Sequence, residues 1–106
     1  MLVAFSVAPS VAADETGSVS AAVAEAIAVV RRSGLPNHTD AMFTTIEGEW
    51  AECMAVVKEC CDVLAAASPR VSLVLKADIR PGFTGELDGK LDRLEAALDA
   101  QRDPGA

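Results

Sequence analysis

The sequence predicts an α+β sandwich, with a four-stranded antiparallel sheet, two helices on one of its faces and a third helix at the C-terminal end. Residues 2–8, 43–47 and 71–80 have the apolar and β-branched alternation of strands. Apolar residues at three- and four-residue spacing between these segments indicate helices. With a short polar strand before residue 43, the order is βαββαβ, which is the ferredoxin-like arrangement.

The first half of the chain predicts a strand, a loop and a helix. Val3, Phe5 and Val7 alternate along residues 2–8. Ser18 is the predicted N-cap of the first helix, because a serine hydroxyl can accept from the free amide groups of a first turn. The apolar stripe of that helix is Val19, Val23, Ile27 and Val30. Gly34 and Pro36 end it.

A hairpin and a second helix are predicted next. Residues 37–42 are expected to form an edge strand and residues 43–47 a better one, joined by a tight connection near residues 40–42. Glu49 and Glu52 then suit the positive end of a helix. Its predicted apolar face consists of Trp50, Cys53, Met54, Val57, Cys60, Cys61 and Leu64.

The last third of the chain predicts a strand and a helix. Val71–Arg80 has the clearest alternation in the sequence, which predicts one buried face and one mixed face. Thr84 is the expected cap of the closing helix, whose stripe is Leu87, Leu91, Leu94 and Leu98. We expect residues 1–101 to form a single domain and residues 102–106 to be a frayed tail.

Composition restricts the classes of partner. The 106 residues are 51% hydrophobic and have a formal net charge of −7, with a mean hydropathy of +0.28. So much apolar surface in a small domain predicts burial between subunits, as a homo-oligomer whose dimers can pair into tetramers. The negative charge argues against nucleic acid, which needs clustered Lys and Arg, and suits a cationic small ligand.

No apolar run approaches the ~20 residues of a membrane span, and the apolar N-terminus has no basic residue before it, unlike a signal peptide. We therefore expect a cytoplasmic protein without a membrane partner. The three cysteines are best interpreted as small core hydrophobes. With His38 the only histidine, no metal site and no nucleophile–base pair is predicted.

Charged residues at the ends of two predicted strands form the best candidate site. Glu47 ends one strand, and Lys76 and Asp78 alternate near the end of another. Glu47 could instead be a solvated charge or the partner of a helix dipole, and Lys76 and Asp78 could form an ion pair. Trp50 either fills the core or lines the mouth of a pocket, where it could stack on a cation.

Several segments together resemble one family. They are Ala8-Pro9, Ser18-Val19-Ser20, Thr39 to Met42, Thr44 to Trp50 and Lys76 to Arg80, followed by an amphipathic helix. This pattern, over roughly residues 2–99, resembles the thiamine-binding protein family of YkoF-like ferredoxin-like proteins in its single-domain form. The resemblance implies a cytoplasmic, oligomeric protein that binds thiamine or its hydroxymethylpyrimidine part without catalysis or cofactor.

The resemblance also implies a set of ligand-binding residues: Ser18, Met42, Phe43, Thr44, Thr45, Glu47, Trp50, Lys76 and Asp78. Two features depart from the family pattern. Residues 10–13 lack the glycine often found in relatives, and Phe43 replaces a small residue, so it could stack on a ligand or fill its space.

Two other functions remain open from the residues alone. One is an oligomeric regulatory or scaffold module that uses the open sheet face only for assembly. The other is a small enzyme without a cofactor, in which Glu47 or Asp78 would act as the acid or base.

Overall fold

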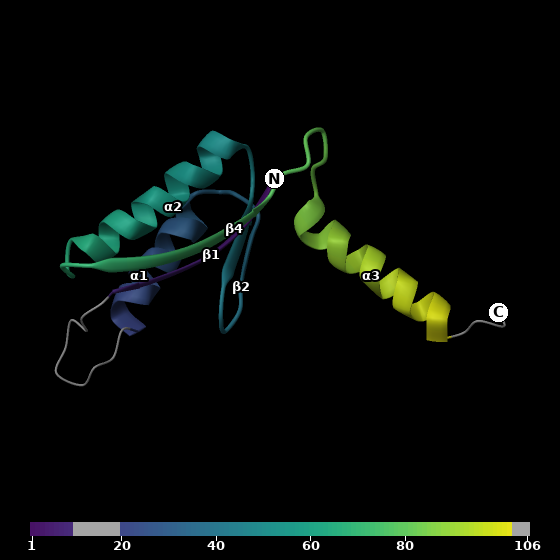
Figure 1. Ribbon diagram of the computed structural model, residues 1–106, viewed down its shortest axis with the longest axis horizontal. Helices are drawn as coiled ribbons and strands as arrows, with labels where there is room; N and C mark the ends of the chain where they lie inside the picture. Colours follow the sequence, from purple (N-terminus) through teal and green to yellow (C-terminus); the bar gives the residue numbers. More distant parts are fainter. Residues whose placement is uncertain (10–19, 103–106) are drawn as a thin grey trace.

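The computed structural model describes residues 1–9 and 20–102 and has the predicted ferredoxin-like topology (Figure 1). The strands are β1 (Leu2–Pro9), β2 (Asn37–Thr39), β3 (Thr44–Glu47) and β4 (Val71–Asp78). They form one sheet in the order β2-β3-β1-β4, and every neighbouring pair is antiparallel. The helices are α1 (Ser20–Arg32), α2 (Trp50–Ala65) and α3 (Glu86–Arg102).

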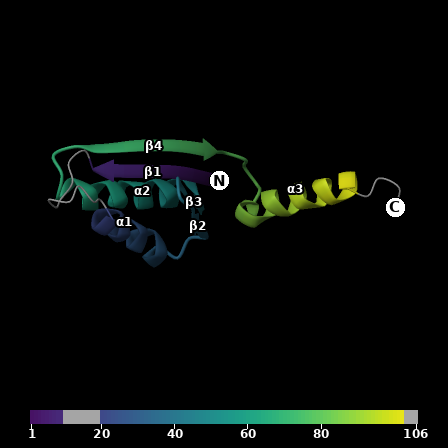
Figure 2. The ribbon, with the colours of Figure 1, turned by 90° about the horizontal axis from the view of Figure 1, so that it is seen from below.

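Helices α1 and α2 cover one face of the sheet (Figure 2). In the register, Val3 of β1 lies opposite Ile46 of β3, so both side chains are on the same face. Between this face and the helices lies the core, which consists of Val3, Phe5, Ala26, Val29, Val30, Ile46, Cys53, Val56, Val57 and Cys60. The other face carries Leu2, Ala4 and Ser6 and is open to solvent except where α3 begins.

Helix α2 begins with a capping box between Glu49 and Glu52. Each of these side chains accepts a hydrogen bond from the backbone amide of the other residue, which satisfies two of the free donors of the first turn. Trp50, an expected member of the apolar face, is instead 59% exposed, and Val56 is buried. The core-facing stripe therefore begins at Cys53, because the first turn extends past the end of the sheet.

The prediction for residues 37–42 was wrong at its C-terminal end. Strand β2 stops at Thr39, and residues 40–43 form the turn that leads into β3. The physical reason is the Asp40 carboxylate, whose Oδ1 accepts from the amides of Met42 at 2.8 Å and Phe43 at 2.9 Å. This side chain competes with the ladder for those amide groups and closes the hairpin early.

The prediction of a buried face for residues 71–80 was also wrong. Strand β4 ends at Asp78, and Leu73 and Leu75, which share the helix-facing side with Val7 and Phe5, are exposed. The cause is position: β4 is an edge strand, and the two helices lie mainly over the centre of the sheet. The alternation of residues along this strand therefore predicted the correct sheet face for each side chain, but it overestimated how deeply the helix-facing side chains are buried.

Helix α3 projects away from the rest of the molecule (Figures 1 and 2). It begins at Glu86, without the predicted Thr84 cap, and continues through Arg102, one residue beyond the expected domain limit. Residues 103–106, the remainder of the expected tail, lie outside the described residues. The principal extents of 59 × 31 × 20 Å reflect this projecting helix.

Candidate functional site

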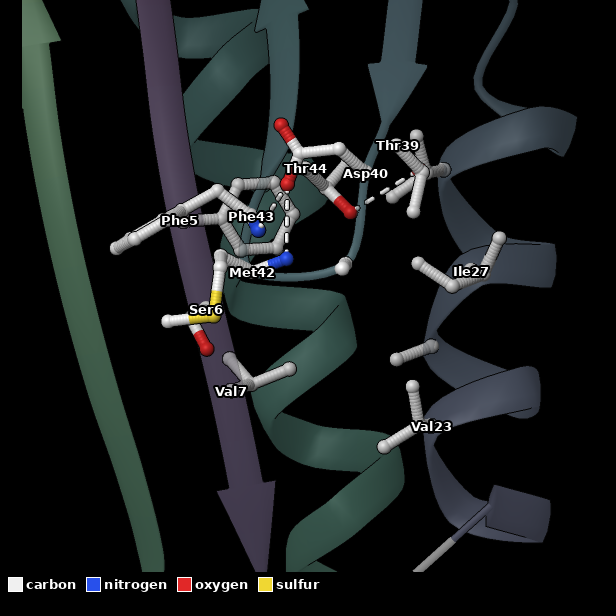
Figure 3. Close-up of a pocket in the computed structure, with 13 residues that line it drawn as sticks. Phe5, Ser6, Val7, Val23, Ile27, Thr39, Asp40, Met42, Phe43 and Thr44 are labelled. Atoms are coloured by element: carbon white, nitrogen blue, oxygen red, sulfur yellow. Dashed lines mark hydrogen bonds between the residues drawn. The ribbon is translucent and has the colours of Figure 1, made fainter.

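A cavity of about 220 Å³ lies between the sheet and α1, at the end closed by the β2–β3 hairpin (Figure 3). Apolar side chains from two elements face one another across it: Val7 from β1, and Val23 and Ile27 from α1. The remaining lining residues are Phe5, Ser6, Ala26, Val30, Thr39, Asp40, Ala41, Met42, Phe43 and Thr44. The cavity is thus an apolar hollow whose polar groups gather at the hairpin.

Two threonine hydroxyls form the polar end of the cavity. Thr39 and Thr44 are opposite each other in the β2–β3 register, and their Oγ1 atoms are 3.1 Å apart. Thr44 is buried and also pairs with Phe5, which places its side chain on the helix-facing side. Whichever hydroxyl donates to the other, the pair retains one free proton and free lone pairs. The pair can therefore both donate a hydrogen bond to, and accept one from, a polar group placed in the cavity.

Asp40 adds a negative charge beside the hydroxyl pair. The amides of Phe43 and Met42, which hydrogen-bond to Oδ1, hold the pKa of Asp40 below its usual value, and nearby His38 contributes in the same direction. Asp40 also donates from its backbone amide to the carbonyl of Phe43 at 3.0 Å. The hairpin thus presents an ionised carboxylate at a fixed place near neutral pH.

The structure brings together only part of the predicted set of ligand residues. Met42, Phe43 and Thr44 line this cavity. Ser18 lies outside the described residues. Thr45, Glu47, Lys76 and Asp78 are on the open face of the sheet, and Trp50 is at a third location.

The polar strand ends do meet on one face, as the sequence suggested. Leu2 is paired with Glu47 on one side and with Asp78 on the other, so these two carboxylates flank one residue of β1. Both are engaged by α3. Glu47, nearly fully buried, accepts from the amides of Glu86 at 2.8 Å and Leu87 at 3.3 Å, and Asp78 forms an ion pair with Lys90. This row of the sheet therefore anchors a helix.

Trp50 lines a separate cavity of about 170 Å³ at the far end of the sheet, together with Met1 and the loop after β4. In that loop the guanidinium carbon of Arg80 lies 3.6 Å from the ring centroid of Phe83. Arg80 therefore already occupies one aromatic face near Trp50.

Two polar residues of the hairpin cavity, Thr39 and Asp40, were not singled out as ligand residues. A signal for Asp40 was present, because aspartate often begins a turn by accepting from amides two residues ahead. Thr39 and Thr44 lie opposite each other only if the hairpin turns at a particular residue. The sequence alone did not specify that residue.

No group of three or more metal-ligating side chains occurs among residues 1–9 and 20–102, and none of the described helices is long and apolar enough to cross a membrane. The three cysteines are free thiols on α2, and Cys53 and Cys60 are buried.

The fold and the cavity define a class: a ferredoxin-like α+β protein with a small apolar cavity beneath its β2–β3 hairpin. The model of the family described as thiamine-binding protein matches residues 3–95, and the chain belongs to this family. A UPF0045 protein of Mycobacterium bovis is 52% identical over 99 residues, which are 92% of this chain and 94% of the relative. A Mycobacterium tuberculosis UPF0045 protein matches equally well.

Solved structures share the fold. A Methanocaldococcus jannascii protein of unassigned function superposes with a TM-score of 0.78 at 29% identity, covering 89% of this chain and 94% of that one. A Thermotoga maritima protein, described as a candidate thiamine biosynthesis/salvage protein, superposes with a TM-score of 0.70 at 30% identity. That match covers 85% of this chain and 95% of the other.

Proposed function

We propose that this protein binds the hydroxymethylpyrimidine part of thiamine, free or within thiamine, in the cavity under the β2–β3 hairpin, and does so without catalysis. The Thr39–Thr44 hydroxyl pair at the end of an apolar hollow is the observation that carries the proposal. An aminopyrimidine presents a donor and an acceptor along one edge, and the pair offers the complementary acceptor and donor. Membership of the thiamine-binding family supports this choice.

The size and charge of the site favour the pyrimidine as the buried part. About 220 Å³ is below the ~300–1,000 Å³ usual for drug-sized ligands, so a single ring fits better than whole thiamine. The cationic thiazolium of thiamine would then remain at the mouth, where the ionised Asp40 and the net charge of −7 favour it. Met42 and Phe43 supply the apolar contacts of the hairpin.

We further propose a cytoplasmic homo-oligomer, most simply a dimer that can pair into a tetramer. The large apolar side chains left exposed on β4 and α3 support assembly, and the free thiols of α2 suit a reducing compartment.

Calorimetric titration with hydroxymethylpyrimidine, thiamine and thiamine diphosphate tests the ligand. We expect saturable binding of the first two, and recovery of the ligand chemically unchanged. The near-isosteric Thr44→Val removes one hydroxyl of the pair and should weaken binding at least about tenfold, because a polar ligand edge is left unpaired.

Glu47→Gln is the matched control, since Glu47 lies on the other face of the sheet and should leave affinity unchanged. Weakened binding in Glu47→Gln with normal binding in Thr44→Val would move the site to the open face. No heat with any of the three compounds would contradict the proposed ligand.

A further inference from the structure

The cavity beside Trp50 gathers exposed apolar side chains from two separate segments of the chain. Trp50 and Ile79 are each 59% exposed, and Phe83 is 47% exposed. All three line the same hollow of about 170 Å³. A single exposed apolar residue is common on a protein surface, but several grouped around one cavity indicate a place where a ligand can bind. This end of the sheet is therefore a candidate site in its own right.

The loop after β4 holds Arg80 in a defined position. Pro81 and Gly82 are the central residues of a tight turn, in which Gly82 has a φ of 82° and the Phe83 amide donates to the Arg80 carbonyl at 3.2 Å. This is a type II turn, which favours proline at its second position and needs a positive φ at its third. The turn brings its first and fourth residues together, so the guanidinium of Arg80 rests on the Phe83 ring.

Arg80 retains its capacity to bind an anion. None of the salt bridges among residues 1–9 and 20–102 includes its guanidinium, and stacking on Phe83 uses a face of that group rather than the N–H donors at its edge. Glu49, the acidic residue that lines the cavity, is held in the capping box of α2. A stacked guanidinium with an open N–H fork matches a carboxylate, which it can bind through two parallel hydrogen bonds.

We propose that this cavity is a second binding site, which takes a small aromatic carboxylate. The carboxylate pairs with Arg80, and the ring packs among the exposed apolar side chains, where aromatic rings attract one another. The volume of about 170 Å³ limits the ligand to one ring. A singly charged group also suits a chain of net charge −7 better than a phosphate does. The site is independent of the pyrimidine site, because the two cavities share no lining residue.

Trp50 makes binding directly observable, because it is the only tryptophan of a chain without tyrosine. Its fluorescence should change saturably as the full-length protein is titrated with benzoate. Benzamide has the same ring without the charge, and acetate has the charge without the ring. Each should bind at least about tenfold more weakly, because each lacks one of the two contacts. No saturable change with benzoate, or benzamide binding as tightly as benzoate, would overturn the proposal.

Substitutions at Arg80 test the role of its guanidinium. Arg80→Gln should raise the dissociation constant for benzoate at least about tenfold, and Arg80→Lys should restore only part of the affinity, because an ammonium keeps the charge and loses the planar fork. Arg70→Gln is the matched control, since Arg70 is exposed at the opposite end of β4 and its loss changes the net charge equally. Circular dichroism verifies that every variant is folded. Unchanged benzoate binding in Arg80→Gln, or equal weakening in Arg70→Gln, would contradict the contact with Arg80.

Two cross-measurements separate this site from the pyrimidine site. Thr44→Val should bind benzoate with the wild-type dissociation constant, and Arg80→Gln should bind hydroxymethylpyrimidine as wild type does. Benzoate binding without pyrimidine binding would contradict the proposed function alone, and the reverse result would contradict the second site alone. Loss of benzoate binding in Thr44→Val would place benzoate in the hairpin cavity and overturn the second site.

Discussion

Cys60 shows how completely a single side chain can be removed from solvent in this small protein. It is fully buried on the inner side of α2, and its Sγ donates to the carbonyl of Ala26 on α1 at 3.4 Å. Burial raises the pKa of the Cys60 thiol to about 11, and neighbouring Cys61 adds to the effect. Cys60 thus acts as a hydrogen-bonded spacer between two helices.

This raised pKa predicts a loss of stability in alkaline solution. Cys60 ionises near pH 9 in the unfolded chain and near pH 11 in the folded chain. The contribution of the protonated thiol to the free energy of unfolding is therefore complete below pH 9 and is lost as the pH rises toward 11. We expect the free energy of unfolding in urea to fall by roughly 2 kcal/mol more in wild type than in Cys60→Ala across this range. An equal fall in the free energy of unfolding of the two proteins over this pH range would contradict the raised pKa of Cys60.

Single residues also show what the sequence could define at the candidate site. The resemblance to the thiamine-binding family placed Met42, Phe43 and Thr44 in the predicted ligand set, and these three residues line the hairpin cavity. The same reasoning could not determine that Glu47 accepts from the amides of α3. Those amides lie 39 and 40 residues further along the chain, and such a contact depends on how the helix returns to the sheet.

At the scale of elements, strand β3 contributes side chains both to the hairpin cavity and to the contact with α3. Thr44 faces the hairpin cavity from one side of the strand, and Glu47 reaches α3 from the other. A four-residue strand can do this because successive side chains alternate between faces. Element types were largely predictable from periodicity, whereas the exposure of β4 was not, since edge position is a property of the assembled sheet.

The Glu47 anchor should control the stability of α3 specifically. Replacing a carboxylate that caps a helix N-terminus costs about 1–2 kcal/mol, so Glu47→Ala should speed amide hydrogen exchange in the first turns of α3 at least about fivefold. Amides of β1 should keep wild-type protection. Glu59→Ala, at an exposed position on α2, is the control and should leave the exchange of α3 unchanged.

At the scale of the whole molecule, assembly and folding should be linked. A chain that buries its exposed leucines only in a dimer gains stability by mass action, because the partner binds the folded state alone. The ferredoxin-like layering followed from the sequence, since each layer is encoded by local patterns. The direction in which α3 projects could not be predicted from the sequence, because it is set by the contacts of α3 with Glu47 and Asp78.

Thermal unfolding should therefore depend on protein concentration. We expect the Tm of wild type to rise by several degrees between micromolar and near-millimolar protein, as scanning calorimetry would measure. The Tm of Leu94→Glu should be independent of concentration over the same range. A concentration-independent wild-type Tm would mean that the folded chain is stable without a partner.

The edge strand β4 has a consequence for aggregation. Among the strands of residues 1–9 and 20–102, β4 is hydrogen-bonded only to β1, and an edge strand of this kind can pair with a strand from another molecule. Its sequence from Leu73 to Ala77 is apolar except for Lys76, and stacking identical strands would bring those ammonium groups together every ~4.8 Å. We therefore expect Lys76 to disfavour the stacking of β4 into fibrillar aggregates, because a charge within an apolar strand opposes such stacking.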